Sequence, residues 1–130
     1  CIRDSVSGDE RIEVVRHDGR GGLRPWASVA SPAACHSGFT IPDALQAADF
    51  DGDGDLDLLV VDPLGNRVRV HLNSGDGRFI GSIEAAVGVR PMDAAAIDLD
   101  GDGRIDIVTA NAGGSGGTVS VLRNLTPVIE

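Results

Sequence analysis

Hydrophobic and polar residues alternate along much of this chain, and this alternation is typical of half-buried β-strands. The clearest run is RVRVHL at residues 67–72, and the pattern recurs in RIEVV at residues 11–15 and in TVSVL at residues 118–122. Glycine-rich turn sequences follow the first two runs, HDGRGG at residues 17–22 and SGDG at residues 74–77. Such turns join neighbouring strands into hairpins. The pattern therefore predicts an all-β chain.

Two further segments are hydrophobic almost without interruption. They are LDLLVV at residues 56–61 and IDIVTA at residues 105–110, and both are short and rich in β-branched residues. This pattern predicts strands that are covered on both faces. Small residues precede each segment at some distance, with alanines at residues 47–48 and 94–96. We expect these alanines to lie in the strand that enters the acidic loop described next.

The first acidic loop, residues 49–57, has the sequence DFDGDGDLD. Ca²⁺ binds six to eight oxygen ligands at about 2.3–2.6 Å in a flexible geometry, and alternate Asp residues on a tight loop supply such oxygens. We expect Asp49, Asp51 and Asp53 to bind through their carboxylates and Asp57 to complete the shell. Asp55, at the seventh loop position, is expected to bind through its backbone carbonyl.

The second acidic loop, residues 98–106, repeats this spacing as DLDGDGRID. Asp98, Asp100, Asp102 and Asp106 take the carboxylate positions. Arg104 stands at the seventh position, where a backbone ligand is expected because its side chain cannot coordinate a cation. A single acidic loop is often a solvated turn. Two copies with matching spacing, whose carboxylates repel one another without a cation, instead predict two calcium sites. Magnesium fits less well because it requires a stricter octahedral geometry.

The loops do not match the helix-loop-helix calcium hand. That hand requires a bidentate Glu at the twelfth position of its loop. The twelfth positions here are Val60 and Thr109, and strand-like segments follow both loops. Each loop is therefore expected to join two strands.

The two loops begin 49 residues apart, at Asp49 and Asp98. This period is in the range of a β-propeller blade, and alanine-rich strands fit the crowded position near a propeller axis. The sequence predicts an N-terminal segment, residues 1–41, with the outer hairpin of one blade at about residues 11–30. A complete blade follows at residues 42–88 and an incomplete one at residues 89–130. A β-sandwich with two acidic turns is the alternative.

The segment AADFDGDGDLDL at residues 47–58, followed by RVRVHLNSGDGRF at residues 67–79, resembles the FG-GAP/VCBS repeat of integrin α-type β-propellers and bacterial surface proteins. The resemblance covers most of residues 41–124. It departs from the family pattern at residues 111–117, where NAGGSGG replaces a short link. The resemblance implies an extracellular propeller whose calcium loops stiffen each blade, and a role in adhesion, ligand display or scaffolding.

Composition agrees with an exported, acidic, calcium-binding protein. The formal net charge is −9, and two bound Ca²⁺ ions would bring it to about −5. We therefore expect no nucleic-acid partner, and we expect no membrane span because no apolar run is long enough. A binding or adhesion module at the cell surface, with a protein or carbohydrate ligand, is the first functional hypothesis.

Two other functions also agree with the sequence. Propellers close with about four to eight blades, whereas this chain has about two and a quarter. Neighbouring chains could complete blades by donating the N-terminal hairpin, which would make the protein a self-assembling ring or fibre subunit. The third hypothesis is an accessory domain of an exported enzyme. We expect no catalytic activity in this chain itself, because its three histidines are scattered and no nucleophile–base pattern is readable.

The two cysteines and one long link are the remaining distinctive features of the sequence. Cys1 and Cys35 could form a disulfide in an oxidising compartment, remain free thiols, or, for Cys1, carry a lipid as in bacterial lipoproteins. Residues 31–41 form a link of extra length, and loops on a rigid scaffold often carry binding specificity. This link is the predicted recognition element.

Overall fold

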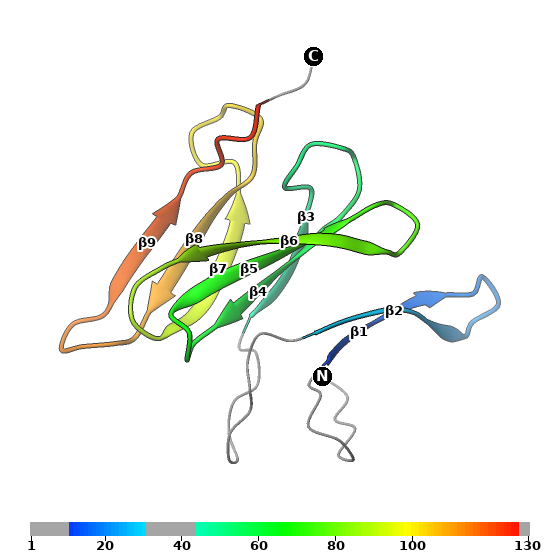
Figure 1. Cartoon of the computed structure of the whole chain (residues 1–130), viewed down its shortest axis with the longest axis horizontal. Coiled ribbons are helices and arrows are strands. Elements are labelled where there is room, and N and C mark those ends of the chain that lie inside the picture. The colour runs from blue at the N-terminus through cyan, green and yellow to red at the C-terminus, as the bar shows by residue number, and fades with distance from the viewer. Residues whose placement is uncertain (1–10, 31–43, 128–130) are drawn as a thin grey trace.

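The computed structural model describes residues 11–30 and 44–127, and within these ranges every regular element is a β-strand. Segments with alternating or β-branched hydrophobic residues form the strands because such side chains pack well on a pleated surface. Neighbouring strands are antiparallel (Figure 1). The described strands are β1 (Arg11–His17), β2 (Leu23–Ala30), β3 (Leu45–Ala48), β4 (Asp57–Asp62), β5 (Arg67–Asn73), β6 (Phe79–Ala86), β7 (Pro91–Ile97), β8 (Asp106–Asn111) and β9 (Thr118–Leu122).

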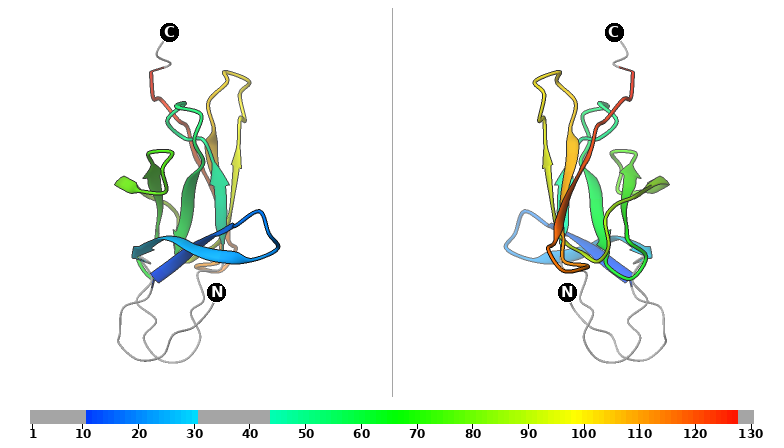
Figure 2. Two further views of the ribbon diagram at one scale, coloured as in Figure 1. Left: turned by 90° about the vertical axis from the view of Figure 1, so that its right-hand side faces the viewer. Right: turned by 90° about the vertical axis from the view of Figure 1, so that its left-hand side faces the viewer.

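The strands form three sheets, each in simple chain order. β1 and β2 make the N-terminal hairpin, β3 to β6 make the first blade, and β7 to β9 make the second blade. This arrangement confirms the predicted all-β fold of about two blades preceded by an outer hairpin. Both acidic loops join the first two strands of a blade, and they extend from the same end of the molecule (Figures 1 and 2).

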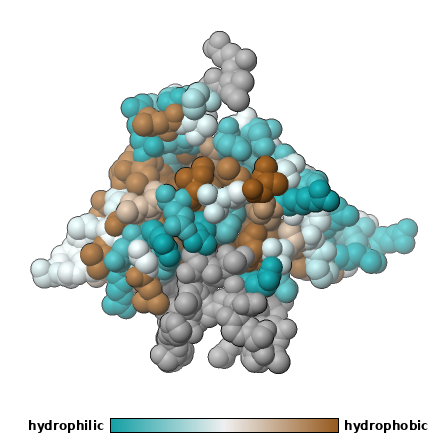
Figure 3. All heavy atoms as spheres, viewed as in Figure 1, coloured by the Kyte–Doolittle hydropathy of each residue, from teal (hydrophilic) through white to brown (hydrophobic). Residues whose placement is uncertain are grey.

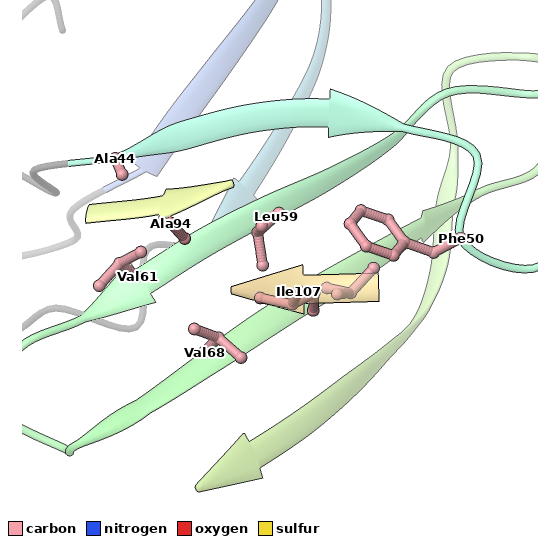
Figure 4. Close-up of a cluster of buried hydrophobic side chains, with 8 residues drawn as sticks. Ala44, Phe50, Leu59, Val61, Val68, Ala94 and Ile107 are labelled. Carbon is pink, nitrogen blue, oxygen red and sulfur yellow. The ribbon is translucent and has the colours of Figure 1, made fainter. Parts of the chain in front are cut away.

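The main hydrophobic core lies between the two blades. Leu59 and Val61 on β4 are 1% and 0% exposed, and Figure 4 shows their side chains beside Ala94 and Ile107 of the second blade. Phe50, at the start of the first loop, packs into the same cluster. Burial of this cluster therefore fixes the first blade, the first loop and the second blade relative to one another.

The innermost strands of the two blades, β3 and β7, lie next to each other. Alanines at residues 47–48 and 94–96 make up much of these strands, and their small side chains allow the close approach. The side-chain oxygen of Gln46 accepts a hydrogen bond from the backbone N–H of Ala96 at 2.9 Å. Among these alanines Ala94 is buried whereas Ala47 and Ala95 are exposed, so only part of the two segments is as crowded as the sequence predicts.

The N-terminal hairpin repeats the outer hairpin of the first blade. In both turns a backbone hydrogen bond of 2.9 Å closes a five-residue loop, from Asp18 to Gly22 and from Ser74 to Arg78. Trp26 on β2 lies against the second of these turns, because a Cβ placed on Gly77 would come within 2.3 Å of the indole ring. Ser28 and Val29 of the hairpin also share a surface hollow with His71 on β5 and with residues 79–82 of β6, so the hairpin lies beside the outer strands of the first blade.

One face of the second blade is hydrophobic and exposed. Val119 and Val121 on β9 are 68% and 55% exposed, and they pair with Ala110 and Val108 on β8. The matching valines of the first blade, which pair with Val61 and Leu59, are at most 5% exposed. Figure 3 shows hydrophobic residues over the side of the molecule where Figure 1 places β7 to β9. The valines of β5 are therefore covered by other parts of the chain, whereas no described residue covers Val119 and Val121 on β9 in the same way.

His71 on β5 is expected to make the stability of the fold depend on pH. It is 7% exposed, its Nε2 has no hydrogen-bond partner among the described residues, and burial, with the charge of Arg69, lowers its pKa from the usual value of 6.5. The unfolded chain therefore takes up a proton near pH 6.5 while the folded chain stays neutral at this position. We expect stability to fall as the pH decreases through about 6.5 towards the lowered pKa.

The measurement is the melting temperature between pH 7.5 and 5.5. His71→Leu removes the titrating side chain and should therefore reduce the pH dependence. Leucine is expected to fit, because Leu122 occupies the matching position of the second blade, opposite Ile107 as His71 is opposite Leu58. His17→Asn, at the exposed end of β1, is the control and should retain the pH dependence. Equal pH dependence in the wild type and the His71 variant would contradict the assignment.

Some predictions fall outside the described residues. They concern Cys1, Cys35 and the link at residues 31–41, all of which lie in the ranges 1–10 or 31–43. Among the described residues, no helix is long and hydrophobic enough to cross a membrane.

Candidate metal centre

The first acidic loop is held by hydrogen bonds from its backbone to its own Asp side chains. Asp49 accepts the N–H groups of Gly52 at 2.7 Å and of Gly54 at 2.9 Å, one on each carboxylate oxygen. Asp51 accepts the N–H of Asp53 at 3.2 Å. Asp side chains favour such local bonds, and Gly52 and Gly54 supply the positive φ angles of 81° and 93° that the loop requires. The DxDGDG sequence therefore favours this tight loop, in which backbone N–H groups point toward the Asp carboxylates.

The second acidic loop repeats this geometry closely. Asp98 accepts the N–H of Gly101 at 2.8 Å on one oxygen and that of Gly103 at 3.0 Å on the other. Asp100 accepts the N–H of Asp102 at 3.2 Å. The glycines again have positive φ angles, 77° and 85°. The same sequence pattern thus produces the same backbone path in both blades.

The last Asp of each loop is buried and joins the loop to the third strand of its blade. Asp57 is 0% exposed, and its two oxygens accept the N–H groups of Phe50 and Asn73, both at 2.8 Å. Asp106 is 2% exposed and accepts those of Leu99 at 3.1 Å and Asn124 at 2.8 Å. Because each carboxylate oxygen has further lone pairs, these bonds leave room for a cation.

Three carboxylates converge in each loop. Single oxygens of Asp49, Asp51 and Asp57 lie within 4.8 Å of one another, and so do those of Asp98, Asp100 and Asp106. Oxygens that bind one Ca²⁺ ion at 2.3–2.6 Å lie at most about 5 Å apart. Hard carboxylate oxygens at this spacing fit Ca²⁺, and six of the ten residues proposed from the sequence belong to these two groups.

The other four proposed ligands lie elsewhere in the loops. Asp53 accepts the N–H of Asp55 at 2.9 Å and is outside the converging group. The carboxylate of Asp55 lies beside Gly75, where a Cβ would come within 2.3 Å of Oδ2. Asp102 is also outside its group, and it forms an ion pair with the side chain of Arg104. For Asp55 and Arg104 the sequence proposed backbone carbonyl ligands, and that role stays a prediction.

Electrostatic conditions differ between the loops. Burial raises the pKa of Asp57, and the charges of Asp51 and Asp53 raise it further. Burial, followed by the charges of Asp53 and Asp49, likewise raises the pKa of Asp51. In the second loop the backbone N–H of Arg104, together with the charges of Arg104 and Arg123, lowers the pKa of Asp102. The first loop therefore carries more uncompensated negative charge.

Two asparagines complete the framework of the loops. The side-chain nitrogen of Asn73 donates to the carbonyl of Leu56 at 3.1 Å. That of Asn124 donates to the carbonyls of Ile105 at 3.1 Å and of Phe50 at 2.8 Å, and the second bond connects the two blades. Reasoning from the acidic spacing missed this role. The available signal is that each Asn lies at or just after the end of the third strand of its blade, 16 or 18 residues after the buried Asp.

A comparison with protein families gives two matches to the model described as FG-GAP-like repeat, at residues 4–60 and 49–109. The first match includes the N-terminal hairpin and the first acidic loop, and the second includes both loops and the whole first blade after β3. Comparisons with curated proteins and with solved structures gave no match.

Proposed function

This chain belongs to the FG-GAP-like repeat family, whose repeats form β-propeller blades, and we propose that it is a calcium-stabilised propeller module that acts outside the cell. The observation that supports calcium most strongly is the repetition of one carboxylate geometry in two loops. Asp49, Asp51 and Asp57 converge in the first blade as Asp98, Asp100 and Asp106 do in the second. A turn that served only to reverse the chain would not need three convergent charges.

The bound ions would stabilise the fold rather than take part in chemistry. Each loop connects the first two strands of a blade, and its buried Asp connects it to the third strand. A cation that neutralises the converging carboxylates would favour the folded arrangement, in which these oxygens lie close together, over the unfolded chain. We therefore assign the loops a structural role and assign no catalytic role to this chain.

Calcium is expected to raise the melting temperature, and excess chelator to lower it. A ligand that binds only the folded state at a concentration one hundred times its dissociation constant stabilises by about 2.7 kcal/mol for each site. Asp51→Asn and Asp100→Asn form a matched pair, because each removes one converging charge without changing side-chain size. Each variant should lose about half of the calcium-induced increase, as measured by differential scanning calorimetry.

The same variants separate metal binding from ordinary turn stability. In chelator, Asp51→Asn should melt at or slightly above the wild-type temperature because it relieves repulsion with Asp49 and Asp53. A calcium-induced increase that is identical in the wild type and in both variants would contradict the proposed sites. A magnesium titration at equal concentration should give the smaller increase, since Mg²⁺ demands stricter geometry.

We place the module at the cell surface or in the extracellular medium, where calcium is abundant, with a protein or carbohydrate as its ligand. The family assignment and the negative charge of −9 support this placement. In this role the paired blades are a rigid support for binding loops, because the core between them fixes their relative position. Labelling of intact cells with an antibody against the chain tests the location, and a signal found only after permeabilisation would contradict it.

A second candidate function, self-assembly, rests on the exposed face of the second blade. Val119 and Val121 are exposed where Val68 and Val70 of the first blade are buried, and β9 is an edge strand of its described sheet. Exposed hydrophobic faces and free edges favour association between chains. Light scattering in calcium buffer tests this function. An oligomer that Val121→Glu converts to monomer supports it, and a wild-type monomer at all concentrations excludes it.

A further inference from the structure

The two acidic loops share most of their backbone hydrogen bonds but differ in the positive charges near them. The first loop contains five Asp residues and no Arg, whereas the second contains four Asp residues and Arg104. Arg104 forms an ion pair with Asp102. Across the described residues, no ion pair joins an arginine to a carboxylate of the first loop.

A second arginine reaches the second loop from the end of β9. Arg123 forms an ion pair with Asp100 through its Nη2 atom, which also lies 3.7 Å from Asp102. Arg123 directly precedes Asn124, and the residue that directly precedes the matching Asn73 in the first blade is Leu72. The positive charge is therefore a feature of the second blade alone.

Asp100 is one of the three convergent carboxylates of the second loop. A cation that enters this loop meets a carboxylate already paired with Arg123 and approaches two positive side chains. Both effects weaken calcium binding, because Arg123 competes for Asp100 and because like charges repel. The same arginines compensate the negative charge of the loop when no cation is bound.

The geometry points to Arg123, assisted by Arg104, as an internal counter-charge that lowers the calcium affinity of the second loop, so that the first loop fills at lower calcium concentration. This inference rests on the proposed calcium function. It predicts a two-step response, in which the first blade is stabilised by metal at low calcium and the second blade only at higher calcium. The affinity of the second step is tuned by the side chain of Arg123, directly after β9, and not only by the ligands themselves.

Two glycine amides report on the loops separately in an NMR titration with Ca²⁺. The N–H of Gly54 donates to Asp49 at 2.9 Å, and that of Gly103 donates to Asp98 at 3.0 Å. In the wild type, we expect the Gly54 signal to respond at lower calcium than the Gly103 signal. Arg123→Gln should lower the midpoint for Gly103 about three- to tenfold, the range expected for removing one partly exposed charge near a divalent ion.

Arg24→Gln is the matched control. Arg24 is also exposed and also forms an ion pair, with Asp18 at 3.4 Å, but it lies in the N-terminal hairpin. The Arg24→Gln substitution changes the net charge by the same amount as Arg123→Gln, so it should move the calcium midpoints of Gly54 and Gly103 slightly and equally. A Gly103 midpoint that is the same in the Arg123 and Arg24 variants, or a wild-type Gly103 signal that responds before Gly54, overturns the inference. A wild type in which neither signal responds to calcium overturns the proposed function itself.

Discussion

Replacing Asp57 by Ala should lower the free energy of unfolding by about 3–5 kcal/mol, even in the presence of chelator. Asp57 is 0% exposed, and its carboxylate accepts two backbone hydrogen bonds of 2.8 Å, from Phe50 and Asn73. Bonds to a charged acceptor contribute about 1.5–3 kcal/mol each, and their loss leaves buried N–H groups without partners. Asp57 therefore stabilises the blade whether or not a cation is bound.

Urea denaturation of the purified variant in chelator measures this effect. Asp53→Ala is the matched control, because Asp53 belongs to the same loop but is exposed and accepts one local hydrogen bond. The control should change the free energy of unfolding by less than about 1 kcal/mol. Equal losses of stability for the two variants in chelator would contradict the claim that the hydrogen bonds of Asp57 to Phe50 and Asn73 stabilise the blade.

Replacing Leu59 by Ala should cost about 2–5 kcal/mol, the range measured for large-to-small changes in packed cores. Leu59 is 1% exposed and lies in the cluster that joins the two blades. The variant removes hydrophobic contacts and leaves a cavity between β4 and the second blade. Because the cluster includes Ala94 and Ile107, the second blade should lose protection from hydrogen exchange together with the first.

Leu64→Ala provides the comparison for this variant, since Leu64 is 60% exposed in the turn between β4 and β5. Thermal denaturation should show little change for Leu64→Ala and a large decrease for Leu59→Ala. A second blade whose hydrogen exchange is unaffected by Leu59→Ala would show that the blades fold independently, contrary to the shared core.

Most of the fold could be predicted because the sequence repeats itself. Alternation in residues 67–72 and the acidic loops at Asp49 and Asp98 define strands, turns and a blade-sized period from local patterns. The alanine-rich segments also indicated which strand of each blade lies innermost, although not that β3 and β7 are neighbours. Contacts between segments far apart in sequence, such as Trp26 with the turn at Gly77, depend on how the sheets are placed and have no local signal.

The candidate site was predicted in part for a similar reason. Spacing identified all the acidic residues, but it could not separate convergent carboxylates such as Asp51 from Asp53, which lies outside the converging group. It also could not show that Asp57 bonds to a residue 16 positions away. The ion pair of Arg123 with Asp100 spans 23 positions and arises only because β9 lies beside β8.

Direct measurement of calcium binding by isothermal titration calorimetry tests the central claim most directly. The wild-type chain, freed of metal and titrated with Ca²⁺, should bind two ions, and Asp51→Asn and Asp100→Asn should each impair binding at one site. Binding of two ions, with one affected in each variant, is the result that the paired carboxylate geometry predicts. A folded wild-type chain that binds no calcium at millimolar concentration would contradict it.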